Sequence, residues 1–225
     1  MDVKKIKGQR LSLLLADFLI CRNCRVVDRD QDRSRFGHEC TACGASGEGG
    51  LMYFQLSVLL LIDLMQEAFH TPSGSGENRD GSTRRAHYVS VVLFFCTLRE
   101  ILLNSLIDHL CWVQKIPKPV YERLLSDSNT YALRQNNLLP SLTGKKWKLL
   151  ATEESHSPKL DYVELDEFMR EAVKARNKFM HEGKRLGIDR NLAEGCIDHI
   201  GPLLNFYVAL HNRYVHPLHL ASNKP

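Results

Sequence analysis

Two C-x2-C pairs constrain the fold of this chain most strongly: Cys21 with Cys24, and Cys40 with Cys43. Their C-x2-C-x15-C-x2-C spacing is typical of a tetrahedral four-thiolate zinc site built from two knuckles. Each pair can direct two thiolates at one ion, and Gly44 suits the tight turn after the second pair. We therefore predict that these four cysteines hold one structural Zn²⁺ that folds residues 1–50.

Disulfide bonds are the alternative reading of these cysteines, and they would require an oxidising compartment. The first twenty residues do not favour export, because Asp17 interrupts their apolar run and no A-x-A-like cleavage site follows. We interpret this segment as a short helix that leads into the first knuckle. The remaining cysteines, Cys96, Cys111 and Cys196, lie in apolar helical contexts and are expected in the core. These observations together predict a cytoplasmic protein.

The composition is that of an ordinary globular protein, with 44% hydrophobic and 25% charged residues. A net charge of +4 is compatible with a nucleic-acid partner without requiring one. The longest apolar stretch after the first twenty residues, 51–62, is interrupted by Gln55 and Ser57 and is too short to span a bilayer. We therefore expect no transmembrane segment and no membrane partner.

Helical periodicity dominates the chain after the cysteine pairs. The first apolar segment is hydrophobic nearly all round and is predicted to be buried. The second is the longest, and Pro117 and Pro119 stop it. Pairing of such helices predicts an all-α bundle over residues 51–225, with the zinc module before it. The four long helices are predicted over residues 51–70, 84–114, 160–183 and 191–214.

Two stretches between these helices leave alternatives open. Residues 138–144 read as a loop, since they contain a proline and end in a glycine. Trp147 follows them among three lysines. Its ring can stack on a base while the lysines contact phosphates, or it can anchor the loop to the core, which is the commoner role.

The helix expected over residues 160–183 carries an arginine where an amphipathic pattern would place an apolar residue. At about 100° per residue, Arg176 falls near the middle of an apolar stripe, so its guanidinium must have a partner. Asn177 and His181 share an adjacent face, and Gly183 is a natural C-cap. Three polar groups therefore converge at one helix end. The stripe comprises Leu165, Phe168, Met169, Ala172, Phe179 and Met180.

Other readings of these polar residues are open. Arg176 can extend its guanidinium to solvent from a helix end, and His181 can complement the helix dipole. Glu100 and Asn104 lie four residues apart on a polar edge of the helix predicted over residues 84–114. An acid there can orient a catalytic base, pair with Arg176 or simply be solvated.

The order Arg-Asn, lysine, aromatic, aliphatic, His at the end of an amphipathic helix resembles the R-N-x-x-x-H signature of the HEPN superfamily. This group of all-helical domains includes many metal-independent ribonucleases. The motif matches at Arg176, Asn177 and His181, and the order of helices extends the resemblance over roughly residues 51–214. A neighbouring branch of the family carries a modified tyrosine two residues after the histidine. Gly183 stands there in this chain, so that form of regulation is not expected.

The resemblance implies a homodimer in which two motif helices form one composite site that cleaves RNA without metal. A base takes the 2′-OH proton, the oxygen attacks the phosphate, and a 2′,3′-cyclic phosphate results. His181 would be the general acid or base, Arg176 would stabilise the transition-state charge, and Asn177 would orient substrate or histidine. Glu100 is a further candidate for the site. Relatives serve as toxins or antiviral defence effectors, and a regulatory partner protein is left open.

Two other functions compete with this interpretation. The chain can be a non-catalytic dimeric module that binds RNA or protein. It can also be a zinc-ribbon scaffold joined to an unrelated helical domain, in which Arg176 is only a structural ion-pair residue. The zinc site does not distinguish them, because a saturated four-thiolate site has no open position for catalysis.

Overall fold

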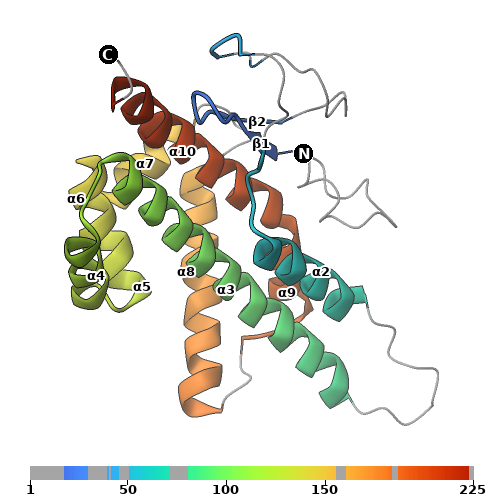
Figure 1. Ribbon diagram of the computed structural model, residues 1–225. Coiled ribbons are helices and arrows are strands. Elements are labelled where there is room, and N and C mark those ends of the chain that lie inside the picture. Colours follow the sequence, from blue (N-terminus) through green and yellow to red (C-terminus); the bar gives the residue numbers. More distant parts are fainter. Residues whose placement is uncertain are drawn as a thin grey trace.

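Helices dominate the computed structural model, which describes residues 18–29, 40, 42–45, 51–70, 81–155, 161–183 and 187–222 (Figure 1). The all-α prediction is confirmed at this level. Three short strands lie beside the helices. The strands are β1 (Phe18–Ile20), β2 (Val27–Arg29) and β3 (Leu51–Met52). The helices are α2 (Leu56–His70), α3 (Gly81–Val113), α4 (Lys118–Asp127), α5 (Tyr131–Leu133), η2 (Arg134–Leu138), α6 (Leu139–Thr143), α7 (Trp147–Glu154), α8 (Tyr162–Glu182), α9 (Arg190–Asp198) and α10 (Ile200–Ser222).

Helix α3 is the centre of the core and packs against α2, α8, α9 and α10. It runs diagonally across the molecule in Figure 1. Its inward side chains, Phe95, Leu98, Leu103, Leu106 and Leu110, are fully buried. The long helix predicted over residues 84–114 is therefore confirmed, and its end precedes Pro117 as expected.

One stretch of α3, Ala86–Val113, is long and apolar enough to cross a membrane by length and composition, with a hydropathy of 1.7. The apolar stretch that is long enough to span a bilayer therefore lies here and not at residues 51–62, where the sequence was compared with a bilayer. In the fold 56% of its apolar window is buried against protein. A central core helix meets the same criterion, because it too is hydrophobic all round.

Helix α2 differs from its prediction in two ways. It begins at Leu56, because Leu51–Met52 is extended as β3 and pairs with β1. It is also not buried all round. Val58, Ile62 and Met65 are buried, whereas Leu56, Leu60 and Leu64 form a stripe that is 64%, 53% and 45% exposed. One helix face thus contributes to the core and the other does not.

The loop predicted over residues 138–144 is wrong, because this segment forms the end of η2 and helix α6. Pro140 lies in the first turn of α6, where a missing N–H costs no hydrogen bond. Gly144 ends the helix in the left-handed region, at φ 74°. Trp147 is buried and its indole N–H donates to Asp166 Oδ1 at 2.8 Å. The ring therefore anchors α7 to α8, as the core alternative predicted.

Helix α8 begins at an Asp161 cap, whose carboxylate accepts the N–H groups of Val163 and Glu164. It ends at Gly183, which has φ 63° and donates its N–H to Phe179 O, as predicted for a C-cap. The helix predicted over residues 191–214 is divided into α9 and α10 at His199, and Pro202 lies in the first turn of α10.

Candidate functional site

The first cysteine pair lies on a β-hairpin. The prediction of a short helix before this pair is wrong for residues 18–20, which are the part of that segment that the structure describes. Phe18–Ile20 forms β1, which pairs antiparallel with β2 on one side and β3 on the other. Phe18 and Ile20 alternate inward and are each 7% exposed. Residues 1–17 lie outside the described residues. Pairing of β3 also extends this small sheet beyond residue 50, where the sequence placed the domain boundary.

The two knuckles share one backbone geometry. In each, the residue after the second cysteine donates its N–H to the carbonyl of the first, at 2.9 Å for Arg25 to Cys21 and 2.8 Å for Gly44 to Cys40. Both donors have positive φ, 63° for Arg25 and 68° for Gly44. The turn that Gly44 was expected to make is therefore present. Arg25 makes the same turn and has the same left-handed backbone conformation, although it is not a glycine.

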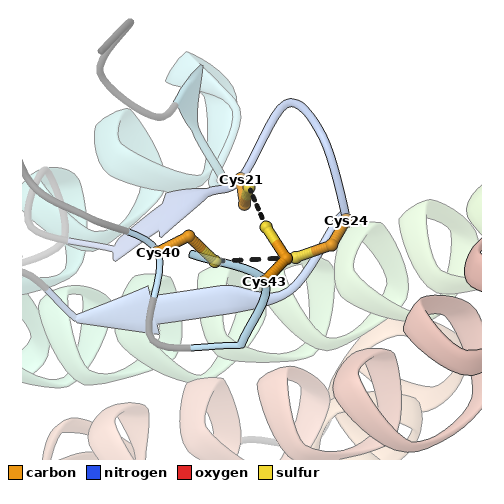
Figure 2. Close-up of side chains that lie close together, drawn as sticks. All are labelled: Cys21, Cys24, Cys40 and Cys43. Carbon is orange, nitrogen blue, oxygen red and sulfur yellow. Dashed lines mark hydrogen bonds between the residues drawn. The ribbon is translucent and has the colours of Figure 1, made fainter. Parts of the chain in front are cut away.

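The four sulfurs converge between these turns (Figure 2). Cys21 Sγ lies 3.9 Å from Cys43 Sγ, Cys24 Sγ lies 3.6 Å from Cys40 Sγ, and all four sulfurs lie within 4.8 Å of one another. A tetrahedron with metal–sulfur bonds of about 2.3 Å has edges of about 3.8 Å, whereas a disulfide bond is about 2.05 Å. None of these four cysteines forms a disulfide bond. The cluster can therefore hold one metal ion.

Electrostatics at the cluster also favour a cation. Burial raises the pKa of the Cys24 thiol well above its usual range and raises that of Cys40. The backbone N–H of Ala45 and the amide of Asn23 lower the pKa of exposed Cys43 to about 7. Four thiolates this close repel one another, and burial disfavours their charge. A positive ion between them would offset both effects.

Helix α10 holds the hairpin through Asn212, a residue that the sequence analysis did not single out. Its side-chain amide donates to Val27 O, and its Oδ1 accepts the N–H of Val27, both at 2.8 Å. Such a pair continues the hydrogen bonding of β2 as a neighbouring strand would. The cysteine module is thereby fixed to the helical bundle.

Two histidines of α10 complete this contact. His216 Nδ1 donates to Cys24 O at 2.6 Å, and His211 Nε2 donates to Arg25 O at 3.0 Å. Both rings bind the backbone of the knuckle. A histidine that binds a carbonyl leaves no spacing signature, so the contact could not be read from sequence.

The arginine of the R-N-x-x-x-H segment lies between α8 and α3. Its Nη2 is 3.5 Å from Glu100 Oε1, and its Nη1 donates to Asn177 Oδ1 at 3.1 Å. The side chains of Arg176 and Glu100 are 34% and 42% exposed. Glu100 was expected to orient a base, to pair with Arg176 or to be solvated. In the structure it pairs with Arg176. Asn104 instead accepts a hydrogen bond from Arg134 at 2.7 Å.

His181 lies in the exposed last turn of α8, on the same face as Asn177. Both lie at a shallow, open surface hollow of about 460 Å³, whose lining residues all belong to one face of α8. Three cationic side chains and one acid line the same hollow with Val173: Arg170, Lys174, Lys178 and Glu182. Asn177 therefore contacts Arg176 on one side and shares the hollow with His181 on the other. The arrangement offers an imidazole beside several positive charges.

The cysteine cluster and the His181 end of α8 lie at opposite ends of the molecule (Figure 1). The strands adjoin α10 near the top of the view, whereas the last turns of α8 extend away from the other helices at the bottom. The cluster therefore cannot contribute ligands or charge to the hollow of the same protomer. This separation agrees with a structural role for the cluster.

Together these features define a mostly helical protein with an N-terminal four-cysteine cluster that can hold a metal ion. Comparisons with protein-family models, with curated proteins and with solved structures gave no match. Any assignment beyond this class rests on the residues themselves.

Proposed function

We propose that this chain is a metal-independent endoribonuclease of the HEPN type. The observation that carries the proposal is the hollow at the end of α8, where Asn177 and His181 lie beside Arg170, Lys174 and Lys178. A row of cations can hold the phosphate backbone of RNA, and a solvent-exposed imidazole can donate or accept a proton. The hollow is open, so an extended strand has access to it.

In the proposed reaction, His181 transfers the proton that makes the ribose 2′-oxygen a nucleophile or that the leaving 5′-oxygen requires. Arg176 stabilises negative charge on the pentacoordinate phosphate, and Asn177 orients the substrate. Glu100 is a positioning residue, because it binds the guanidinium rather than the reacting atoms. DNA lacks the 2′-hydroxyl and should survive.

A composite site between two protomers would bring a second arginine and histidine to the same phosphate. Met180, next to His181, is 59% exposed, and the side chain of Arg176 is 34% exposed. Both would lose water if two α8 helices packed together. We therefore predict a homodimer through this end of α8. Light scattering at micromolar concentration, with and without RNA, should give twice the chain mass, and a monomer in both conditions would remove the composite site.

The metal of the cysteine cluster is proposed to be Zn²⁺. Four thiolates are soft ligands, and a closed tetrahedral set is typical of structural zinc. Such a site folds the β1–β3 module and takes no part in cleavage. Cytoplasmic reducing conditions would keep the thiols available to the metal. By the same resemblance we propose a role as a toxin or antiviral defence effector, controlled by a regulatory partner.

The ion pair between Arg176 and Glu100 favours a second candidate, a non-catalytic module that binds RNA or protein. In that case Arg176 is a structural residue, and its partly exposed pair contributes about 0–1 kcal/mol to stability. Arg176→Ala and Glu100→Gln would then lower the stability of the fold by equally small amounts. RNA would bind to the native chain without being cut.

Catalysis by Arg176 predicts an asymmetric result from the same two substitutions. Arg176→Ala should abolish detectable RNA cleavage, since it removes the transition-state charge. Glu100→Gln can still accept a hydrogen bond from the guanidinium and should keep cleavage within about tenfold of the native rate. Arg123→Ala, which breaks an exposed ion pair with Asp127 on α4, is the matched control and should cleave normally. Equal rates for Arg176→Ala and the native chain would contradict the assignment.

A further inference from the structure

A second cavity lies where the first knuckle meets the helical bundle, far from the hollow at the end of α8. Its volume is about 210 Å³. Residues of β1, of the knuckle turn, of the C-terminal end of α3 and of α10 line it: Ile20, Arg25, His109, Trp112, His211 and Val215. No step of the proposed cleavage uses this cavity.

Three nitrogens of the cavity lining are buried without a hydrogen-bond partner among the described residues: Arg25 Nε, His109 Nδ1 and His211 Nδ1. His211 is only 1% exposed. Leaving a buried polar atom unpaired is destabilising, so clusters of such atoms call for an explanation. Their gathering around one cavity indicates a site for a polar ligand.

Hydrogen bonding fixes what His211 can offer that ligand. Burial lowers the pKa of His211 to about 3, so the ring is neutral. Its Nε2 lies 3.0 Å from the carbonyl of Arg25, which can only accept, so Nε2 carries the hydrogen. Nδ1 is therefore an acceptor. Arg25 Nε–H, in contrast, is a donor. The cavity thus presents both a donor and an acceptor.

Trp112 gives the cavity an aromatic wall. Its ring is on the last turn of α3 and the residue is 52% exposed, which is unusual for so large an apolar side chain. The Arg25 guanidinium carbon lies 5.0 Å from the ring centroid. Ile20 and Val215 complete the lining with apolar surface. A flat ligand could contact the indole and reach the two polar groups.

We propose that this cavity binds a nucleobase, stacked on Trp112 and hydrogen-bonded along one edge by Arg25 and His211. The Watson–Crick edge of each nucleobase carries a neighbouring donor and acceptor, which complement the pair in the cavity. A carboxylate offers only acceptors, and inorganic phosphate offers mainly negatively charged acceptor oxygens, so both would place negative oxygens against the lone pair of His211. The base can come from a free nucleoside or from a single strand of RNA.

The inference concerns base binding and does not depend on cleavage, so the His181→Ala chain serves as the binding protein. Calorimetric titrations with adenosine, guanosine, cytidine and uridine should give saturable binding, with a dissociation constant on the order of 0.1–1 mM for at least one nucleoside. Inorganic phosphate should neither bind there nor compete. A short single-stranded RNA that binds more tightly than the nucleoside identifies a base within a strand as the ligand, and equal affinity identifies the free nucleoside.

Trp112→Ala should weaken nucleoside binding about 5- to 150-fold, the range measured for loss of one base–aromatic stack. Trp112→Phe should restore most of the affinity, which a merely structural role for the indole would not require. Val120→Ala, an exposed apolar residue on α4, is the control and should bind as the parent does. The proposal is overturned if no nucleoside binds at millimolar concentration, if phosphate competes, or if Trp112→Ala binds as tightly as its parent.

Discussion

Cys40→Ser is expected to release the metal and to loosen the module built from β1, β2 and β3. Structural zinc in small modules typically contributes about 10–16 kcal/mol of apparent binding free energy, far more than such short strands can replace. The change removes one of four sulfurs that lie within 4.8 Å of one another. Metal analysis should find loss of the ion, and hydrogen exchange should find loss of protection at the Val27 amide.

The loosening should also reach α10, because Asn212 and His216 bind the backbone of the hairpin. Cys111→Ala removes a buried thiol outside the cluster and should leave both the metal and the Val27 amide unaffected. Native protein, freshly purified and reduced, should carry one equivalent of zinc. A content below about half an equivalent would count against the zinc assignment.

His181→Ala is expected to reduce RNA cleavage to an undetectable level, because general acid–base catalysis typically contributes about 10²–10⁴-fold. The side chain is exposed at the end of α8, so its loss should change neither the helical circular dichroism nor the mass of the protein in solution. His70→Ala is the matched control, since His70 is an exposed histidine in the last turn of α2. An His181→Ala chain that cleaves at the native rate would remove the proton-transfer role.

The elements that could be predicted are those whose signal is local. Helix α3 follows from its apolar spacing, and the end of α8 follows from Gly183. The cysteine cluster follows from the two C-x2-C pairs, because this spacing alone directs four sulfurs at one point. Each of these signals lies within one short stretch of sequence.

Other elements depend on partners that are distant in sequence. Leu51–Met52 is a strand only because it pairs with Leu19 and Ile20 of β1. Residues 138–144 were misread because Pro140 breaks a helix interior but is tolerated in a first turn. The contact of Asn212 with Val27 joins residues 185 positions apart and leaves no pattern in either segment.

In the candidate site, too, local features could be predicted from the sequence and contacts between distant segments could not. The sequence places Asn177 and His181 on one helix face and requires a partner for Arg176. It could not choose among the three roles for Glu100, because the choice depends on how closely α3 and α8 pack. The 3.5 Å distance between the two charged groups supplies that information. It does not by itself separate a catalytic arginine from a structural one.

Product analysis on RNA and on DNA of the same sequence tests the ribonuclease proposal most directly. The native protein would be incubated with both in buffer without added divalent cations, under conditions that do not remove metal from the cysteine cluster. The account predicts that RNA is cut to 2′,3′-cyclic phosphate and 5′-hydroxyl ends, that DNA stays intact, and that His181→Ala produces neither end. Structured and unstructured RNAs that are bound yet remain uncut by the native protein would contradict it and leave the non-catalytic module as the function.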